Sequence, residues 1–217
     1  MTTAPEAEGS FGEQFIEEFD RLLRWRRDVR RFRTDPVEPR LIQEIVAAAE
    51  LAPSVGNSQP WRWVEVRSPE LRAVVKSTFA RCNAEALEGY RGERAQQYAS
   101  LKLAGLDQAP VHLAVFSEDH PQQGHGLGRR TMPETLAYSV VTAISSLWLA
   151  ARARGIGVGW ISIVEPDEVH RALGVPPGWR FVAYLCIGYP EEVNSVPELE
   201  RAGWQARTDP ETRYFIR

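Results

Sequence analysis

Residues 135–151 form the longest run of the chain without a charged side chain, and they are apolar on nearly every side of a helix. Such a helix has no polar face to present to water, so it must lie in a protein core or in an interface between subunits. The run contains Thr, Ser and Tyr and is short for a membrane span, which favours a buried helix. We predict a buried helix over residues 135–154, ended by Gly155.

The rest of the chain alternates between strand-like and helix-like patterns. Short segments rich in Val, Ile and aromatic residues predict strands at residues 61–67, 111–116, 158–164 and 180–187. Helical spacing and start signals predict a helix at residues 10–25, one beginning at Pro39, a helical region at residues 69–106 and a short helix at residues 166–174. Ser10 and Glu13 would form the capping box of the first helix. Strands separated by helices exclude an all-α or all-β fold.

The chain has 217 residues, of which 43% are hydrophobic and 25% are charged, as is typical of a folded protein. We find no repeat and no interior linker, so we predict one domain at residues 10–217 behind a flexible tail at residues 1–9. The charged stretch 85–98, which carries Gly89 and Gly92, predicts a solvated excursion. Residues 190–217 are polar and irregular and predict an arm laid over a neighbouring surface, with Trp204 and Tyr214 as anchors.

Charge and cysteine content exclude several classes of function. A formal net charge of −3 gives no general attraction to nucleic acid or anionic membranes, so any anion site must be a local cluster of cations. Cys82 and Cys186 are far apart and outside any CxxC pattern, which favours a reducing, cytoplasmic location over a disulfide framework or zinc site. The histidines show no metal-ligand spacing, so no metal site is predicted. Residues 1–9 lack the features of a signal peptide.

Six arginines lie within residues 24–33, at the end of the first predicted helix. The guanidinium group binds phosphate oxygens in a bidentate manner, so this segment can be a phosphate clamp. A solvated basic face at a helix end explains the composition equally well. Asp28 is the one acid of the segment, and its commonest role would be a salt bridge to a neighbouring arginine.

Two further segments have the composition of ligand-binding loops. Residues 53–61 (Pro-Ser-Val-Gly-Asn-Ser-Gln-Pro-Trp) place short polar side chains and a glycine just before a strand, where backbone amides can approach a ligand. Residues 155–162 (Gly-Ile-Gly-Val-Gly-Trp-Ile-Ser) have the glycine density of a nucleotide loop. They lie where a helix enters a strand, whereas the dinucleotide fingerprint needs a strand before a helix, so a Rossmann site is excluded.

Together and in this order, these segments resemble the flavin-dependent nitroreductase superfamily from about residue 17 to residue 207. The matching stretches are residues 26–30, 52–56, 59–61, 100–103, 147–153 and 157–163. The resemblance implies an α+β fold, with a mixed, mainly antiparallel sheet flanked by helices. It also implies a homodimer that binds FMN between its subunits. The buried helix at residues 135–154 and the C-terminal arm suit such a dimer.

Asp28 and Ser162 point to one branch of that superfamily. Typical members tend to carry serine at the position of Asp28, whereas this branch carries aspartate there and serine at the position of Ser162. In this branch reduced FMN is the substrate and O2 the co-substrate. The flavin is fragmented to dimethylbenzimidazole, the lower ligand of cobalamin, and erythrose 4-phosphate, and a separate NAD(P)H-dependent reductase supplies the reduced FMN.

The resemblance also assigns roles to individual residues. Asp28 would be the general base, expected to stay ionised unless it is buried away from the arginines, and Ser162 would hydrogen-bond the flavin edge. Residues 82–105 would be a lid that excludes solvent. The FMN contacts would come from Arg26, Arg27, Asp28, Val29, Arg30, Ser54, Gly56, Ser58, Leu103, Ser162 and Arg207.

Two other functions stay open on the sequence alone. The first is an NAD(P)H-dependent nitroreductase or quinone reductase that retains its FMN. The second is a flavin-binding protein without catalytic activity on the same scaffold. The fate of reduced FMN in air separates all three.

Overall fold

The computed structural model describes residues 9–101 and 103–217. The predicted tail at residues 1–9 lies outside this range apart from Gly9, and Lys102, inside the predicted lid, lies outside it as well. The description below concerns the described residues only.

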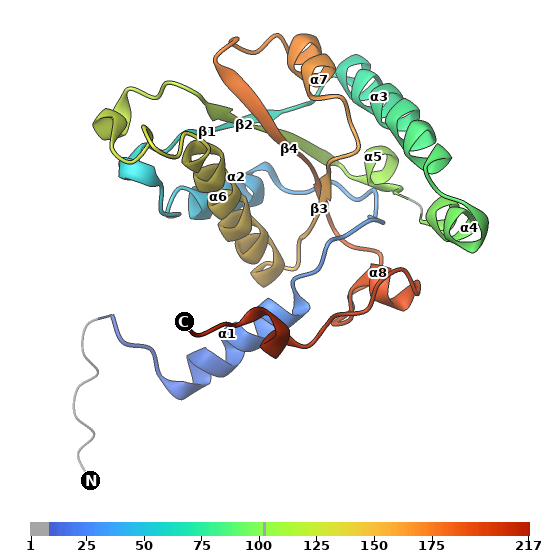
Figure 1. Ribbon diagram of the computed structural model, residues 1–217, viewed down its shortest axis with the longest axis horizontal. Helices are drawn as coiled ribbons and strands as arrows, with labels where there is room; N and C mark the ends of the chain where they lie inside the picture. Colours follow the sequence, from blue (N-terminus) through green and yellow to red (C-terminus); the bar gives the residue numbers. More distant parts are fainter. Residues whose placement is uncertain (1–8, 102) are drawn as a thin grey trace.

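A four-stranded antiparallel sheet forms the centre of the molecule (Figure 1). Its strands are β1 (Trp61–Glu65), β2 (Val111–Glu118), β3 (Gly157–Ile161) and β4 (Trp179–Gly188), in the order β1-β2-β4-β3. All three neighbouring pairs are antiparallel, and one parallel bridge, between Asp28 and Val158, lies outside the named strands. The predicted α+β fold with a mainly antiparallel sheet is confirmed.

Helices cover both faces of the sheet (Figure 1). One face carries α2 (Pro39–Ala49) and α6 (Thr135–Ala153), and the other carries α3 (Pro69–Glu88), α5 (Gly105–Gln108) and α7 (Pro166–Leu173). The remaining helices, α1 (Glu13–Trp25), α4 (Gly92–Ser100) and α8 (Glu198–Arg201), lie at the periphery. Short 3-10 turns occur at Val55–Asn57, Gln123–Gly126 and Pro210–Arg213.

Strand periodicity divides the core into two clusters. Leu113 and Val115 of β2 face α2 and α6, whereas Ala114 and Phe116 face the opposite side. The same alternation runs along β4, because successive side chains of a strand point to opposite faces. Both faces of the central strands are covered, which explains why β2 is buried along nearly its whole length and β4 from Ala183 onward.

Helix α6 lies in the core, as its charge-free sequence predicts. Its buried side chains line one face: Leu136, Ser139, Val140, Ala143, Ile144, Leu147 and Ala151. By length and hydropathy α6 also meets the criteria for a membrane-spanning helix, as core helices of soluble proteins often do. On its opposite face Tyr138 and Val141 are exposed in the single chain.

Several elements begin or end at other residues than predicted. Helix α1 begins at Glu13 with Gly12 as its N-cap, two residues beyond the predicted Ser10. The helical region 69–106 is three helices, because α3 ends at Gly89 and Gly92 adopts a positive φ of 55°. Strand β3 ends at Ile161 rather than at residue 164, and the amide of Glu165 beyond it binds Thr78 of α3.

Helix α1 buries none of its residues within the chain. Its apolar stripe, which includes Phe15, Phe19 and Leu23, is exposed, and Phe11 stacks on Phe15 with ring centroids 4.5 Å apart. A contiguous exposed apolar surface of this kind is typical of a protein–protein contact.

Candidate functional site

The segment that carries Asp28 lies against the outer edge of β3. Val29 N donates to the Val158 carbonyl over 3.0 Å, and Asp28 pairs with Val158 in the parallel bridge. Gly157 and Gly159 permit this approach: a Cβ on Gly157 would lie 2.8 Å from Val29 Cγ2, and one on Gly159 would overlap the Val29 carbonyl oxygen. The glycines of this strand therefore allow a second backbone segment to pack closely against it, as glycine inside a strand often does.

The Asp28 carboxyl is held by two groups at this edge. Its Oδ1 accepts a hydrogen bond from Trp160 N at 3.0 Å, and its Oδ2 lies 3.6 Å from Arg30 Nε. The side chain retains 41% of its accessible surface and opens to a cleft, whereas that of Arg30 retains 12%.

Burial has the largest influence on the Asp28 carboxyl and raises its pKa above the ordinary 3.8. The Trp160 amide and Arg30 act in the opposite direction, and Glu198 adds to the increase. The net effect of these surroundings is an increase in the pKa of Asp28, in spite of the nearby charge of Arg30. A raised pKa makes a carboxylate a better proton acceptor once it is ionised.

Two tryptophans form an aromatic wall beside Asp28. The Arg26 guanidinium lies over the Trp148 ring, 5.0 Å from its centroid, and the Trp148 and Trp160 centroids are 6.5 Å apart. Trp148 Nε1 also donates to the Arg27 carbonyl at 3.3 Å. The end of α6 therefore fixes the arginines and β3 relative to each other, with an aromatic surface between them.

The C-terminal arm of the same chain closes one side of the arginines. Arg27 donates through Nε and Nη2 to the Ser195 carbonyl, at 2.9 and 2.6 Å. Arg31 Nη2 lies 3.6 Å from Glu198 Oε1. Arginines and arm together line a small cavity next to Asp28. We call Arg26, Arg27, Arg30 and Arg31 the arginine cluster.

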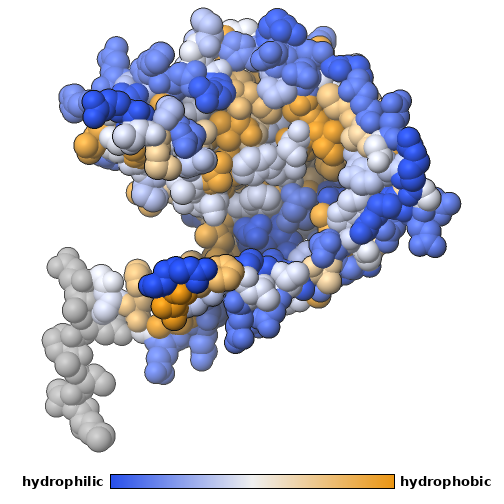
Figure 2. Space-filling model, in the orientation of Figure 1, coloured by the Kyte–Doolittle hydropathy of each residue, from blue (hydrophilic) through white to orange (hydrophobic). Residues whose placement is uncertain are grey.

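Arg207 of the arm adds a further positive charge near Arg26 and Arg27. Burial lowers the pKa of Arg26 and of Arg27, and repulsion from Arg207 lowers both further. Repulsion between partly desolvated guanidinium groups is relieved when an anion binds between them. The arrangement of Arg26, Arg27 and Arg207 therefore fits a phosphate group, and Figure 2 shows hydrophilic residues at the floor of the hollow in the molecule.

The second predicted contact region is the loop at residues 54–59. Ser54 Oγ accepts from Gln59 N at 3.0 Å, and Val55 N donates to Ser139 Oγ of α6 at 3.0 Å. Gly56 has a positive φ of 58°. Asn57 and Gln59 also have positive φ angles, of 54° and 44°, although they are not glycines. Strained backbone of this kind is concentrated at ligand sites. The loop packs against the Gly-rich turn at residues 123–128.

Ser58 stands apart from the other predicted contacts. Its side chain is 1% exposed, and within the described residues its hydroxyl has no hydrogen-bond partner. Ser54 and Gly56 are half-buried at the loop surface.

Within one chain the loop and the arginine cluster are separate. Helix α6 connects them, since Ser139 contacts the loop and Trp148 contacts the cluster. These two residues lie about 13 Å apart along the helix axis at a rise of about 1.5 Å per residue. The pockets lined by the two regions share no residue. The loop and the arginine cluster are therefore two separate parts of the surface of one chain.

Ser162 is exposed and lies just beyond the end of β3, not inside a strand as predicted. It lies two residues after Trp160, whose amide binds Asp28. In extended chain, the Cα atoms of Trp160 and Ser162 are therefore about 7 Å apart. Ser162 therefore belongs to the same end of the sheet as Asp28.

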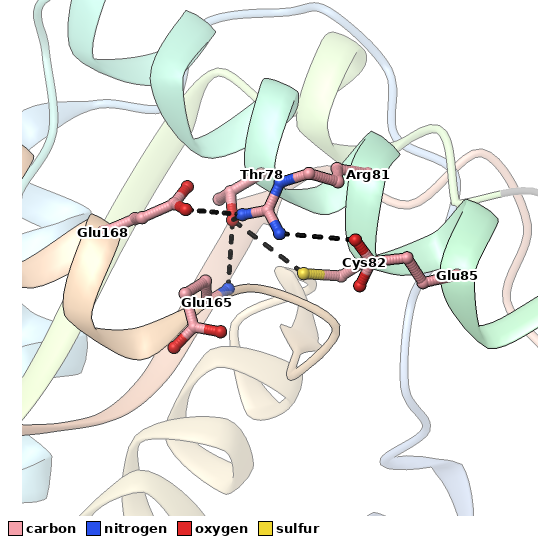
Figure 3. A network of polar contacts seen from close by, with 6 residues as sticks. All are labelled: Thr78, Arg81, Cys82, Glu85, Glu165 and Glu168. Atoms are coloured by element: carbon pink, nitrogen blue, oxygen red, sulfur yellow. Dashed lines mark hydrogen bonds and ion pairs between the residues drawn. The ribbon is translucent and has the colours of Figure 1, made fainter.

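A polar network fixes the connection that follows Ser162 (Figure 3). Buried Thr78 of α3 accepts through Oγ1 from Glu165 N at 3.1 Å. Arg81 bridges Thr78 to Glu168 of α7, with 2.6 Å between Arg81 Nη2 and Glu168 Oε1. Since α3 also leads into the predicted lid, the network joins the base of the lid to the Ser162 segment.

Leu103 is half-buried and packs against the core cluster that contains Phe32 and Val29. The neighbouring Gly105 touches the Phe32 ring, because a Cβ there would lie 3.0 Å from Phe32 Cε2. The C-terminal end of the predicted lid therefore lies beside the segment that follows Asp28.

Sequence reasoning did not identify Trp148, Trp160, Ser195 and Glu198 as parts of this site. Strand glycines signalled a close backbone approach at residues 157–159, although not the identity of the approaching segment. Nothing local in the sequence marks the Ser195 carbonyl or Glu198, because the arm meets the arginine cluster only in the folded chain.

Fold and site together define an α+β protein with an arginine cluster beside an acid and an aromatic wall. The chain belongs to the nitroreductase family, whose model matches residues 23–189. A crystal structure of iodotyrosine deiodinase bound to FMN and 3-iodo-L-tyrosine has 26% sequence identity and a TM-score of 0.68, over 81% of this chain and 91% of that one. The family and this FMN-bound relative support a flavin site.

Two curated relatives show which branch of the family this chain resembles. A protein of Rhodospirillum rubrum is 56% identical over 91% of this chain and 93% of its own length, and is named 5,6-dimethylbenzimidazole synthase. A protein of Rhodobacter capsulatus with the same name is 53% identical over 85% of this chain and 89% of its own length. A BluB-like flavoprotein of Clostridium difficile shares the fold, with a TM-score of 0.66 and 20% identity over 92% of this chain and 99% of that one. The predicted resemblance is confirmed.

Proposed function

We propose that this chain is a 5,6-dimethylbenzimidazole synthase, which fragments reduced FMN with O2 to dimethylbenzimidazole and erythrose 4-phosphate for the lower ligand of cobalamin. The observation that carries the proposal is the placement of Asp28, which the Trp160 amide holds beside Arg30 in a cavity lined by arginines and the C-terminal arm. Two relatives that are more than 50% identical to this chain are named 5,6-dimethylbenzimidazole synthase.

Residues of this chain have distinct roles in the proposal. Arg26, Arg27 and Arg207 bind the 5′-phosphate, whose charge relieves the repulsion among them. The Trp148–Trp160 wall lies beside the phosphate site. Bound reduced flavin supplies the electrons for O2 reduction.

Asp28 takes a proton from the ribityl side of the flavin. Arg30 and the Trp160 amide hold its two oxygens, so the carboxylate keeps one orientation. Ser162, exposed at the same end of β3, hydrogen-bonds the flavin edge. Val29, Arg30 and Leu103 line the site, and the lid at residues 82–105 excludes water from it.

We further propose that the active unit is a homodimer, located in the cytoplasm and served by a separate NAD(P)H-dependent flavin reductase. Within one chain, the loop with Ser54, Gly56 and Ser58 and the arginine cluster contact α6 at separate positions. In a dimer this loop would meet the cluster of the second chain. The exposed stripe of α1 and the exposed face of α6 provide apolar surface for that contact.

The experiment that tests the function is aerobic incubation of purified protein with chemically reduced FMN, followed by chromatography of the products. We expect dimethylbenzimidazole and irreversible loss of flavin. Full recovery of oxidised FMN would favour an FMN-retaining NAD(P)H oxidoreductase. A putative NAD(P)H nitroreductase of Bacillus subtilis, 30% identical over 81% of this chain and 86% of its own length, represents that alternative.

Replacing Glu198 with glutamine should shift the acid limb of the kcat/KM pH profile to lower pH. Glu198 raises the pKa of Asp28, so removing its charge lets Asp28 stay ionised, and active as a base, in more acidic solution. Glu192→Gln is the matched control, because Glu192 pairs with Arg201 in the same cavity. An unchanged acid limb in the Glu198 variant would contradict the assignment of that limb to Asp28.

A further inference from the structure

The C-terminal arm and helix α4 of the predicted lid meet in an aromatic cluster. Tyr90 and Tyr98 stack with ring centroids 4.8 Å apart, and Trp204 of the arm contacts both, at 5.6 Å and 6.1 Å. The Arg94 guanidinium lies over the Trp204 ring, 4.8 Å from its centroid. Aromatic pairs and a cation–π contact in one place stabilise the docking of the two segments.

Hydrogen bonds fix the same contact in one register. Arg94 Nη1 donates to the Trp204 carbonyl at 2.8 Å, and Gln97 Nε2 donates to the Gly203 carbonyl at 3.1 Å. Tyr98 donates through its hydroxyl to Asn83 Oδ1 of α3 at 2.9 Å, which ties α4 to the base of the lid. Helix α4 buries none of its residues, so these contacts with the arm and with α3 hold it in place.

The arm carries this attachment directly to the arginine cluster. On one side of Trp204, the Ser195 carbonyl binds Arg27 and Glu198 pairs with Arg31. On the other side, Arg207 lies close enough to Arg26 and Arg27 to lower the pKa of both. Arg207, which would bind a phosphate together with Arg26 and Arg27, and Trp204, which contacts α4, therefore belong to one short segment, residues 195–207.

We propose that Trp204 is a positioning residue that couples phosphate binding at the arginine cluster to closure of α4 over the flavin. A phosphate held by Arg26, Arg27 and Arg207 fixes the arm, and the arm fixes α4 through Trp204. This proposal rests on the proposed function for the identity of the phosphate-bearing ligand, which is FMN. The coupling itself requires only that FMN binds.

The coupling has a chemical consequence for an enzyme that handles reduced flavin in air. An open site allows the simple two-electron reaction in which reduced FMN and O2 give oxidised FMN and H2O2. That reaction returns the flavin intact and competes with its fragmentation. Loss of Trp204 should therefore shift the products from dimethylbenzimidazole to H2O2 by about tenfold, the scale of an ordinary coupling between two sites.

Limited trypsin digestion tests the coupling without turnover, because Arg91 and Arg94 provide cleavage sites at α4. In the unaltered chain, oxidised FMN should slow cleavage after Arg91 by about tenfold, and riboflavin, which lacks the phosphate, should not. Trp204→Ala should lose this protection, and Trp204→Phe should restore most of it. Tyr214→Ala is the matched control, because Tyr214 is an arm aromatic that is 77% exposed.

Arg94→Met provides a second variant, since Arg94 is exposed and its loss leaves the core intact. It should reduce FMN protection at Arg91 and raise the ratio of H2O2 to dimethylbenzimidazole, as Trp204→Ala does. Equal protection by riboflavin and FMN, or full protection in both variants, overturns the coupling. If the unaltered chain shows FMN-specific protection that Trp204→Ala loses, yet forms no dimethylbenzimidazole, the coupling stands and the proposed function fails.

Discussion

Replacing Asp28 with asparagine should lower the rate of dimethylbenzimidazole formation by about 10³-fold, the usual scale of a lost general base. Asparagine keeps the shape of the side chain and can still accept from the Trp160 amide, so the edge of β3 should stay intact. The variant loses the group that accepts a proton. Steady-state product formation from reduced FMN in air is the measurement.

Affinity for FMN should change little in the same variant. The phosphate site is formed by arginines, so the Kd of oxidised FMN, measured by fluorescence quenching, should stay within about threefold, less than 1 kcal/mol of binding free energy. Asp35→Asn is the matched control, because Asp35 is an exposed acid paired with Arg33 only a few residues away. Normal turnover in Asp28→Asn would contradict the assignment of the base.

Replacing Gly159 with alanine should lower turnover by at least about 100-fold, the cost of a catalytic group displaced by about 1 Å. The new Cβ would overlap the Val29 carbonyl oxygen, so the segment with Asp28 must move away from β3. Overpacking of this kind should also lower the free energy of unfolding by about 1–3 kcal/mol, measured by urea denaturation.

Gly178→Ala is the matched control for this substitution. A Cβ on Gly178 meets nothing within 4 Å, and its φ is not positive, so the change should be nearly neutral. A Gly159→Ala protein with unaltered turnover would show that the approach of Val29 to β3 is not needed to position Asp28.

Much of the fold follows from local patterns in the sequence. The charge-free stretch of α6 has no polar face, so the sequence predicts that this helix is buried. Successive side chains of β2 and β4 enter the cores on the two faces of the sheet, as expected of central strands. Boundaries that depend on distant partners were harder to predict. Strand β3 ends early, and Thr78, from another part of the chain, binds the Glu165 amide beyond it.

The site was predicted less completely for the same physical reason. The arginine-rich segment by itself fits a solvated face as well as a phosphate clamp, and only folding shows that Arg27 and Arg31 are bound by the arm. The pKa of Asp28 was also beyond local reasoning, because it depends on how closely β3 and the arm surround the carboxyl. The glycines at residues 157–159 carried a usable signal, since close packing in a strand requires them.

The central claim, that the flavin is consumed, is tested most directly by a single-turnover balance of the flavin. Purified protein in excess is mixed with a limiting amount of chemically reduced FMN, exposed to air, and denatured when the reaction is complete. We expect one dimethylbenzimidazole for each FMN lost and little oxidised FMN, with Asp28→Asn returning the flavin as oxidised FMN and H2O2. Quantitative recovery of oxidised FMN from the unaltered protein would contradict the account.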